Sequence, residues 1–248
     1  MKIGTINMDW LKNKKSQKSF FLEDIEKQDL DFIIITETLD SFNLSSNYNK
    51  IQTNTLPTAG KYEYLDYGAY NKGELSVRVA IFSKHQFIEP LDVIEKFTSV
   101  AGLYKTPIGE IIVYGTIIGT WGIQKQKEIA EKELNNFIND IEKLSTLNKQ
   151  IIIGGDLNTS LKVEEKRSLT QIDSRNALTN FFNKHNLTVT TKDQNHCIDH
   201  IIISEGLATQ FRYEASEFLD NGILKDEPHV GVLCSLINKP TSEAINTT

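Results

Sequence analysis

The stretch Gly154-Gly155-Asp156-Leu157-Asn158 carries the densest set of side chains in this sequence that could do chemistry. Its two glycines allow a tight backbone turn, and Asp156 and Asn158 then project from the same side of an extended chain. A carboxylate and an amide placed in this way can hold a water molecule or a hard metal ion together with a phosphate oxygen. The pattern therefore favours chemistry on a phosphoester, although a lone aspartate after a strand is more often a turn former or a helix cap.

Four more polar side chains lie at the ends of short apolar runs, namely Asn7, Glu37, Asp199 and His229. In α/β sheets ligands bind where strand ends meet loops, so we expect these side chains to gather at one edge. Phosphoester hydrolysis needs an activated water molecule and neutralisation of charge on the phosphoryl oxygens. A carboxylate-bound divalent ion, an amide donor and an imidazole with a carboxylate partner would supply both. Taken alone, His229 would be interpreted as a strand-edge histidine and Asp199 as a strand-start carboxylate.

The strands that must position these groups are predicted by short runs rich in β-branched residues. Most of the runs are continuously apolar rather than alternating, which indicates strands covered on both faces, as in a layered α/β protein. The predicted strands span residues 31–36, 77–83, 110–118, 150–154, 198–203 and 230–236.

Helices are predicted between these strands. Apolar residues at three- and four-residue spacing predict an amphipathic helix over residues 123–146. A second helix is expected over residues 174–186 with Ser174 as its N-cap, and a third near residues 16–28. Residues 45–75 are rich in Asn, Tyr and Gly, which predicts irregular strands and loops.

Length and composition are typical of one globular domain. The chain has 248 residues without a linker-like segment, so we expect one domain over residues 1–238 and a polar, disordered tail over residues 239–248. The sequence opens as a predicted strand and shows neither a secretory signal nor a membrane span, which favours a cytoplasmic location. Cys197 and Cys234 are expected to be buried free thiols rather than a disulfide or a metal pair.

The net charge of -6 weakens non-specific attraction to nucleic acid, which depends on neutralisation of phosphates by Lys and Arg. This argues against a tightly bound DNA coat protein but is compatible with a nuclease that has a local basic rim. One basic cluster comprises Lys12, Lys14, Lys15 and Lys18, although a solvated helix start has the same composition.

Taken in order, five segments resemble motifs of the endonuclease/exonuclease/phosphatase superfamily, which includes DNase I-like nucleases, abasic-site endonucleases, sphingomyelinases and inositol polyphosphate phosphatases. The segments are Ile6-Asn7, Thr36-Glu37-Thr38, Gly155-Asp156-Leu157-Asn158-Thr159, Ile198-Asp199-His200-Ile201 and Pro228-His229. Their order and approximate spacing match across residues 3–236. The resemblance implies a four-layer α/β sandwich, with two mixed β-sheets packed face to face and helices on the outside.

The resemblance also implies the roles of the metal and phosphate ligands. Glu37 is similar to the principal metal ligand of the family, and Asn7 would lie beside it. The metal would be Mg²⁺ or Mn²⁺, because these hard ions prefer carboxylate, carbonyl and water oxygens. Asn158 would bind a phosphate oxygen.

Activation of the attacking water molecule has two candidate arrangements within the same resemblance. In one, Asp199 orients His229, and the pair activates or positions the water. In the other, Asp156 does so itself.

Two positions depart from the family pattern. Pro228 replaces the aspartate that normally precedes the histidine, so the metal affinity and the number of metal ions are open, and Asp226 or Glu227 could take its place. Relatives carry a His or Tyr near the end of the strand that matches residues 113–118, where this chain has Thr116 or Ile117. Tyr114 is close, but a single step along a strand reverses the face to which a side chain points.

Two side chains have open assignments. Arg78 interrupts an apolar run, so it needs either an internal ion pair or a substrate phosphate. Trp121, in the loop after the strand over residues 110–118, is either a packing residue or a substrate contact.

Motifs that this chain lacks narrow the range of possible substrates. It lacks the signature of the inositol phosphatases, and His196 stands where abasic-site endonucleases carry a tryptophan. The favoured function is an endo- or exonuclease acting on nucleic acid. The alternatives are hydrolysis of a small phosphoester, such as a nucleotide or a lipid headgroup, and a non-catalytic binding module on the same fold.

Overall fold

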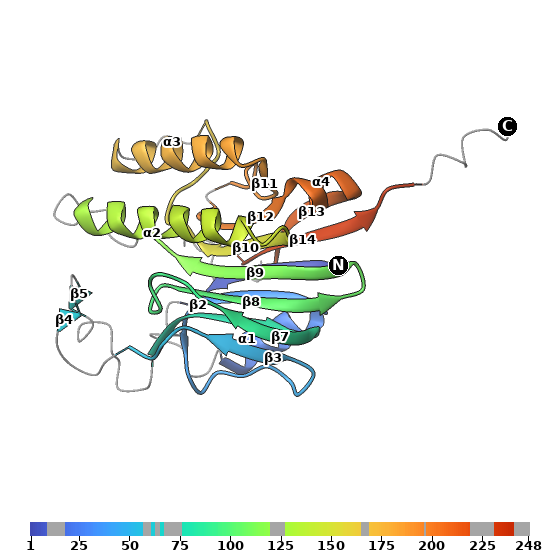
Figure 1. Cartoon of the computed structure of the whole chain (residues 1–248). Coiled ribbons are helices and arrows are strands. Elements are labelled where there is room, and N and C mark those ends of the chain that lie inside the picture. The colour runs from blue at the N-terminus through green and yellow to red at the C-terminus, as the bar shows by residue number, and fades with distance from the viewer. Residues whose placement is uncertain are drawn as a thin grey trace, which may run out of the picture.

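Continuous apolar runs form the central strands of two six-stranded sheets in a computed structural model of the chain (Figure 1). The first sheet comprises, in spatial order, β13 (Phe211–Phe218), β14 (Gly231–Asn238), β1 (Lys2–Asn7), β2 (Phe32–Leu39), β6 (Ser76–Ser83) and β3 (Asn49–Gln52). The second comprises β11 (Leu187–Val189), β12 (Asp199–Ser204), β10 (Gln150–Asp156), β9 (Gly109–Ile117), β8 (Ser99–Thr106) and β7 (Gln86–Leu91). The structure describes residues 1–8, 18–56, 61–62, 65–66, 76–119, 127–164, 169–195, 197–218 and 231–240.

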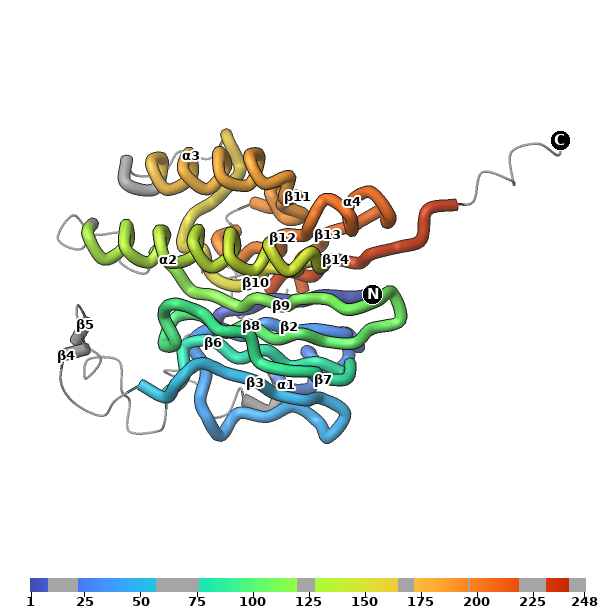
Figure 2. Tube along the Cα trace, viewed as in Figure 1, coloured from blue at the N-terminus to red at the C-terminus, as the bar shows by residue number. Residues whose placement is uncertain are grey.

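Both sheets are mixed. β1 runs parallel to β2, and β9 runs parallel to β10, whereas their other neighbours are antiparallel. β1 and β14 pair along their length although they come from opposite ends of the chain, as the tube in Figure 2 shows. This pairing joins the two ends of the sequence within one sheet.

The two sheets pack face to face through an apolar inner layer. Alternate residues of the strands point into it, among them Ile34, Val79, Ile152 and Ile201, each fully buried. A Cβ atom added at Gly154 would lie 2.8 Å from Cδ1 of Ile34, so a side chain there would have to displace Ile34 of the facing sheet.

Helices cover the outer faces. α2 (Lys127–Ser145) and α3 (Leu169–Lys184) pack on the second sheet through Phe137 and Phe182 (Figure 1). α1 (Lys18–Lys27) packs on the first sheet through Ile25. The remaining elements are the short helix α4 (Glu205–Gln210) and a two-stranded ribbon of β4 (Lys61–Tyr62) and β5 (Leu65–Asp66). The predicted arrangement of two face-to-face mixed sheets with outer helices is therefore confirmed.

The expected N-cap at Ser174 is wrong. α3 begins at Leu169, so Ser174 lies inside the helix. Residues 169–173 contain neither Gly nor Pro, so nothing in them prevents the helix from starting before the serine. The other two helices fall within their predicted ranges, and the six predicted strands are present with ends shifted by a few residues.

Both cysteines are buried free thiols, as predicted. Burial raises the pKa of the Cys234 thiol to about 11, which keeps it protonated and unreactive. In the described part of the chain, none of the helices combines the length and the apolarity that a membrane crossing requires. Residues 241–248 of the expected tail lie outside the described residues.

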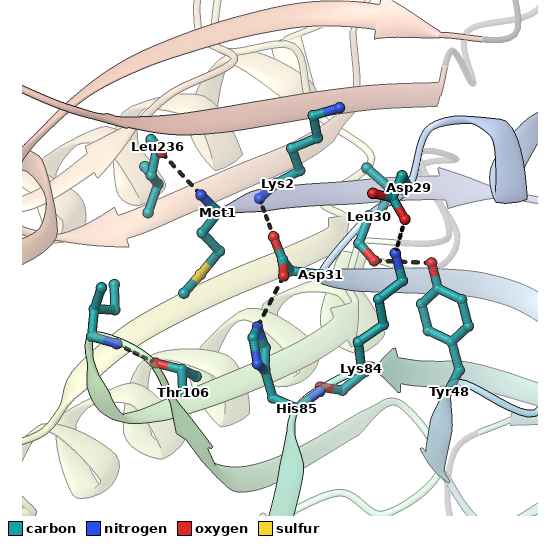
Figure 3. A network of polar contacts seen from close by, with 12 residues as sticks. Met1, Lys2, Asp29, Leu30, Asp31, Tyr48, Lys84, His85, Thr106 and Leu236 are labelled. Atoms are coloured by element: carbon teal, nitrogen blue, oxygen red, sulfur yellow. Dashed lines mark hydrogen bonds and ion pairs between the residues drawn. The ribbon is translucent and has the colours of Figure 1, made fainter.

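A polar network closes the end of the sandwich where β1 and β2 begin (Figure 3). The Asp31 carboxylate accepts a 2.7 Å hydrogen bond from the backbone N of Lys2 and lies 3.1 Å from Nε2 of His85. Burial raises the pKa of the Asp31 carboxyl, but these contacts outweigh it and leave the pKa below its usual value. Lys84 and Asp29 form an ion pair beside this cluster. The network is structural, because the predicted site residues lie at the opposite ends of β1 and β2.

Candidate active site

Pairing of β1 with β2 brings Asn7 and Glu37 to the same edge. The two strands are parallel, and Asn7 is the ladder partner of Thr36, the residue before Glu37. Both side chains are largely buried, with 4% of Asn7 and 8% of Glu37 exposed. The first sheet thus presents an amide and a carboxylate on neighbouring strands, as the sequence predicted.

The second sheet brings Asp156 and Asp199 together. The two aspartates are ladder partners in the antiparallel pair of β10 and β12. Side chains alternate along a strand, and Ile152 and Ile201 point into the inner layer. Asp156 is four residues after Ile152 and Asp199 is two before Ile201, so both aspartates point to the same inner face. Opposite residues on one face of a sheet have Cβ atoms roughly 5 Å apart. Two carboxylates therefore face the first sheet at this edge.

A hydrogen bond between side chains joins the two sheets at this edge. Nδ2 of Asn7 donates to Oδ2 of Asp156 over 2.9 Å, and both residues are buried. Because Nδ2 is the donor in this bond, Oδ1 is the atom through which Asn7 would bind a cation. The predicted gathering of Asn7 and Asp156 is thus present as a direct contact.

The turn after β10 holds Asn158 against the same carboxylate. The backbone N of Asn158 donates to Oδ1 of Asp156 over 2.7 Å, and its Nδ2 donates to the carbonyl of Ile118 over 3.1 Å. Asn158 has a φ of 49°, in the left-handed region that few residues other than glycine adopt. Gly155 has a φ of 133°, and a Cβ there would lie 1.9 Å from the carbonyl oxygen of Thr116. The predicted tight turn therefore requires glycine at position 155.

Glu37 also has unusual backbone geometry. Its φ is 50°, although it lies within β2. The ladder with β6 pairs Thr36 with Val79 and Thr38 with Val77, which leaves Glu37 and Arg78 between the two pairs. Strained backbone inside a buried strand persists only where the surrounding structure over-determines it, and such strain clusters at functional sites.

Arg78 forms the internal ion pair that was one of its two predicted assignments. Its Nη1 lies 3.4 Å from Oε1 of Glu133 in α2, with 3% and 0% of the two side chains exposed. The sequence did not name the partner, because Glu133 is one of several charged residues in the predicted helix, although it lies three residues after Ala130 and four before Phe137. A substrate contact by Arg78 stays a prediction.

Tyr114 points away from the site, as the parity argument implied. Its hydroxyl donates to Oδ2 of Asp140 in α2 over 3.0 Å and lies 2.8 Å from Oγ of Ser99, on the outer face of the second sheet. Burial raises the pKa of Asp140, and it also raises that of Tyr114 well above its usual value. On the inner face, the ladder partner of Asp156 is the apolar Ile117.

His229 and Trp121 lie outside the described residues, as do Pro228, Asp226 and Glu227. The roles that the sequence assigns to them stay predictions. Within the described residues, Asn7, Asp156 and Asn158 are in contact, Asp199 is the ladder partner of Asp156, and Glu37 lies on the strand next to Asn7.

The oxygen donors at this edge fit a hard divalent cation. Among the described residues, no three His, Cys, Asp or Glu side chains form a group that could hold a metal ion. Mg²⁺ commonly takes only one or two carboxylates and keeps several water ligands. The Glu37 carboxylate and the Asn7 amide oxygen are of this type, so they suit Mg²⁺ or Mn²⁺ and would not favour a softer metal.

Comparison of the sequence with protein-family models and with curated proteins gives no match. Comparison of the fold with solved structures gives several similar proteins of low sequence identity. The 3'-5' exonuclease NExo from Neisseria meningitidis superposes with a TM-score of 0.66 at 13% identity, over 96% of this chain and 100% of that one. An AP endonuclease from Archaeoglobus fulgidus gives 0.65 at 13% identity, over 95% and 99%.

A third structure, an endonuclease/exonuclease/phosphatase from Beutenbergia cavernae, gives a TM-score of 0.65 at 14% identity, over 96% of this chain and 71% of that one. These proteins share the two-sheet architecture over almost the whole of this chain. The chain therefore has the α/β sandwich fold of the endonuclease/exonuclease/phosphatase, or DNase I-like, proteins.

Proposed function

We propose that the chain is a Mg²⁺- or Mn²⁺-dependent phosphoester hydrolase that cleaves nucleic acid phosphodiesters as an endo- or exonuclease. The observation that carries this proposal is the Asp156 carboxylate, whose two oxygens accept hydrogen bonds from Asn7 and from the backbone of Asn158. A carboxylate held at both oxygens is fixed in orientation before a substrate arrives. Such preorganisation is what a hydrolytic site requires of the group that positions water.

The roles in this proposal follow the chemistry of each donor. Glu37 and Asn7 hold the metal ion, which when bound neutralises charge on the phosphoryl oxygens and favours ionisation of a water molecule. Asn158 binds a phosphate oxygen. Its Nδ2 already donates one hydrogen to Ile118, and an amide nitrogen has a second hydrogen to offer.

Water activation is assigned to Asp156 or to a His229–Asp199 pair. Asp156 and Asp199 are ladder partners, so a histidine oriented by Asp199 would act on the same water molecule as Asp156. The two assignments differ in what His229 contributes to water activation. A double-mutant cycle of His229 and Asp199 distinguishes them.

Nucleic acid is favoured as the substrate by the activities of the proteins with similar structures. NExo is described as a 3'-5' exonuclease and the Archaeoglobus fulgidus protein as an AP endonuclease. The cytoplasm stays the expected location.

The test is a substrate screen with the purified protein. Supercoiled plasmid, single-stranded DNA, RNA and bis(p-nitrophenyl) phosphate are incubated with Mg²⁺ or Mn²⁺, and with a chelator as the blank. Asp156→Asn is run in parallel, because it keeps the shape of the side chain and removes its charge. If the parent protein cleaves a polymer in a metal-dependent way and Asp156→Asn does not, the result supports a nuclease. Release of inorganic phosphate from small esters alone would favour a small-molecule phosphatase, and binding of polymer without turnover would favour a binding module.

A further inference from the structure

His200 lies next to Asp199 but points to the other side of the second sheet. Side chains alternate along β12, with Ile201 in the inner layer and Ile202 in the outer one. Asp199 therefore faces the first sheet and His200 faces outward. The imidazole of His200 is 1% exposed and both of its nitrogens have protein partners.

The partners of the ring determine its tautomer. Nε2 lies 2.9 Å from the carbonyl oxygen of Thr159, which can only accept, so Nε2 carries the hydrogen. Nδ1 lies 3.0 Å from Oγ1 of Thr191, which in turn accepts from the backbone N of Ile201. The Thr191 hydroxyl is then free to donate to Nδ1. The ring thus links two loops, one after β10 and one after β11.

The first of these loops carries Asn158. Thr159 follows Asn158 directly, and its side chain is 2% exposed. On the near side, the backbone N of Leu157 donates to the carbonyl of Ile198 over 2.9 Å. After Asn158, the Thr159 carbonyl accepts the hydrogen bond from Nε2 of His200. Asn158 is therefore fastened between two points of the β12 region, in a left-handed backbone conformation that asparagine adopts more readily than other non-glycine residues.

We propose that His200 is a positioning residue for the phosphodiester site, which acts by fixing the Thr159 carbonyl and thereby the conformation of Asn158. This rests on the proposed function of that site. The bond at Nε2 keeps the backbone N of Asn158 aimed at Oδ1 of Asp156, and keeps the Asn158 side chain where it would meet a phosphate oxygen. Without it, the turn that carries Asn158 loses the anchor on its Thr159 side.

Two amide variants that differ in reach separate this role from simple packing. His200→Gln carries an amide nitrogen at about the reach of Nε2, so it can still donate to Thr159. His200→Asn is shorter and reaches only the region of Nδ1. Thr190→Val is the control, because Thr190 is buried next to Thr191 and its hydroxyl donates to the Ile201 carbonyl rather than to Thr159.

The first readout is turnover on the substrate found in the screen. His200→Asn should lower kcat by about tenfold or more, the factor expected for one lost hydrogen bond that orients a reacting group. His200→Gln should stay within about threefold of the parent protein. Thr190→Val should lower the melting temperature and leave kcat unchanged. If His200→Gln and His200→Asn had the same kcat, whether close to that of the parent protein or reduced in both, the proposal would be overturned.

The second readout does not depend on activity. Hydrogen–deuterium exchange of peptides that cover residues 157–164 should speed up in His200→Asn and not in His200→Gln or Thr190→Val. Unchanged exchange in His200→Asn would overturn the positioning role even if the enzyme were active. If the parent protein cleaves no phosphoester but the exchange pattern appears, the proposed function fails while the anchoring of Asn158 by His200 stands.

Discussion

The amide of Asn7 and the carboxylate of Asp156 are 149 residues apart in sequence and join the two sheets by a 2.9 Å hydrogen bond from Nδ2 to Oδ2. The bond makes the position of the Asp156 carboxylate depend on both sheets. It also gives Asn7 a structural role besides the proposed one as a metal ligand.

Replacement of Asn7 tests this relationship. Asn7→Leu keeps the branching and the number of side-chain heavy atoms and removes the donor, so turnover should fall by about tenfold to a hundredfold, as hydrogen bonds to charged groups contribute about 1.5–3 kcal/mol. The measurement is kcat alongside the melting temperature. The control is Thr5→Val, two residues earlier on the same buried face of β1. A loss of turnover as large in Thr5→Val as in Asn7→Leu would contradict a specific role for the amide.

The Asp199–His229 pair should behave as one unit. His229→Ala should reduce turnover by about a hundredfold or more, within the range for general acid–base groups. Asp199→Asn should reduce it too, and the double variant should be little worse than His229→Ala, because such units are not additive. Rates and melting temperatures of the four proteins give the answer. Additive losses would mean that the two side chains act separately and that Asp156 alone activates the water molecule.

The turn at Gly155 should not tolerate a side chain. A Cβ there meets the Thr116 carbonyl oxygen at 1.9 Å, and the φ of 133° is itself unfavourable for other residues. Gly155→Ala should therefore cost several kcal/mol, more than the strain of about 1–3 kcal/mol expected from the backbone alone. Gly109→Ala is the matched control, since its φ is 112° and no atom lies within 4 Å of the added Cβ. Urea unfolding should show a clearly larger loss in the free energy of unfolding for Gly155→Ala than for Gly109→Ala. Equal losses would contradict the clash.

The sequence predicts most of the strands that are buried on both faces, because their apolar runs are continuous and bounded by polar residues. It misses β8, in which Ser, Gly, Lys and Thr interrupt the apolar residues. It does not predict β7 or β13, whose residues are largely exposed and alternate weakly. The start of α3 was misplaced because Ser174 has a capping side chain inside a stretch that can also continue a helix.

The site is predictable as a set of residues but not as a set of contacts. Each polar strand end can be recognised locally, whereas the bond from Asn7 to Asp156 depends on how the two sheets are stacked. The Arg78–Glu133 pair joins positions 55 residues apart and has no local signal. His200 was missed as an anchor because its partner is a backbone carbonyl, which leaves no trace in the residue types.

Acid should remove the contribution of Asp31 to stability. Its pKa is lower in the folded protein than in the unfolded chain, so the carboxylate stabilises the fold above its usual pKa of about 4, and this is lost as pH falls through the folded value. Asp31→Asn should melt at a lower temperature than the parent at pH 7, and the gap should close at the lowest pH at which both proteins fold. A gap that is constant with pH would mean that the charge of Asp31 contributes nothing. Because Asp31 is partly exposed, salt should reduce the gap.

The central claim is that Glu37 holds a divalent metal ion used in phosphodiester hydrolysis. The most direct measurement is the Mg²⁺ and Mn²⁺ dependence of cleavage by the parent protein and by Glu37→Gln, with Mn²⁺ binding followed in parallel by electron paramagnetic resonance. Glu89→Gln, at an exposed position of the edge strand β7, is the control. We predict metal-dependent cleavage by the parent and the control. Glu37→Gln should lose binding and turnover, stay folded, and recover partly at high Mn²⁺. Full activity of Glu37→Gln at ordinary Mg²⁺, or cleavage by the parent that a chelator does not reduce, would contradict the account.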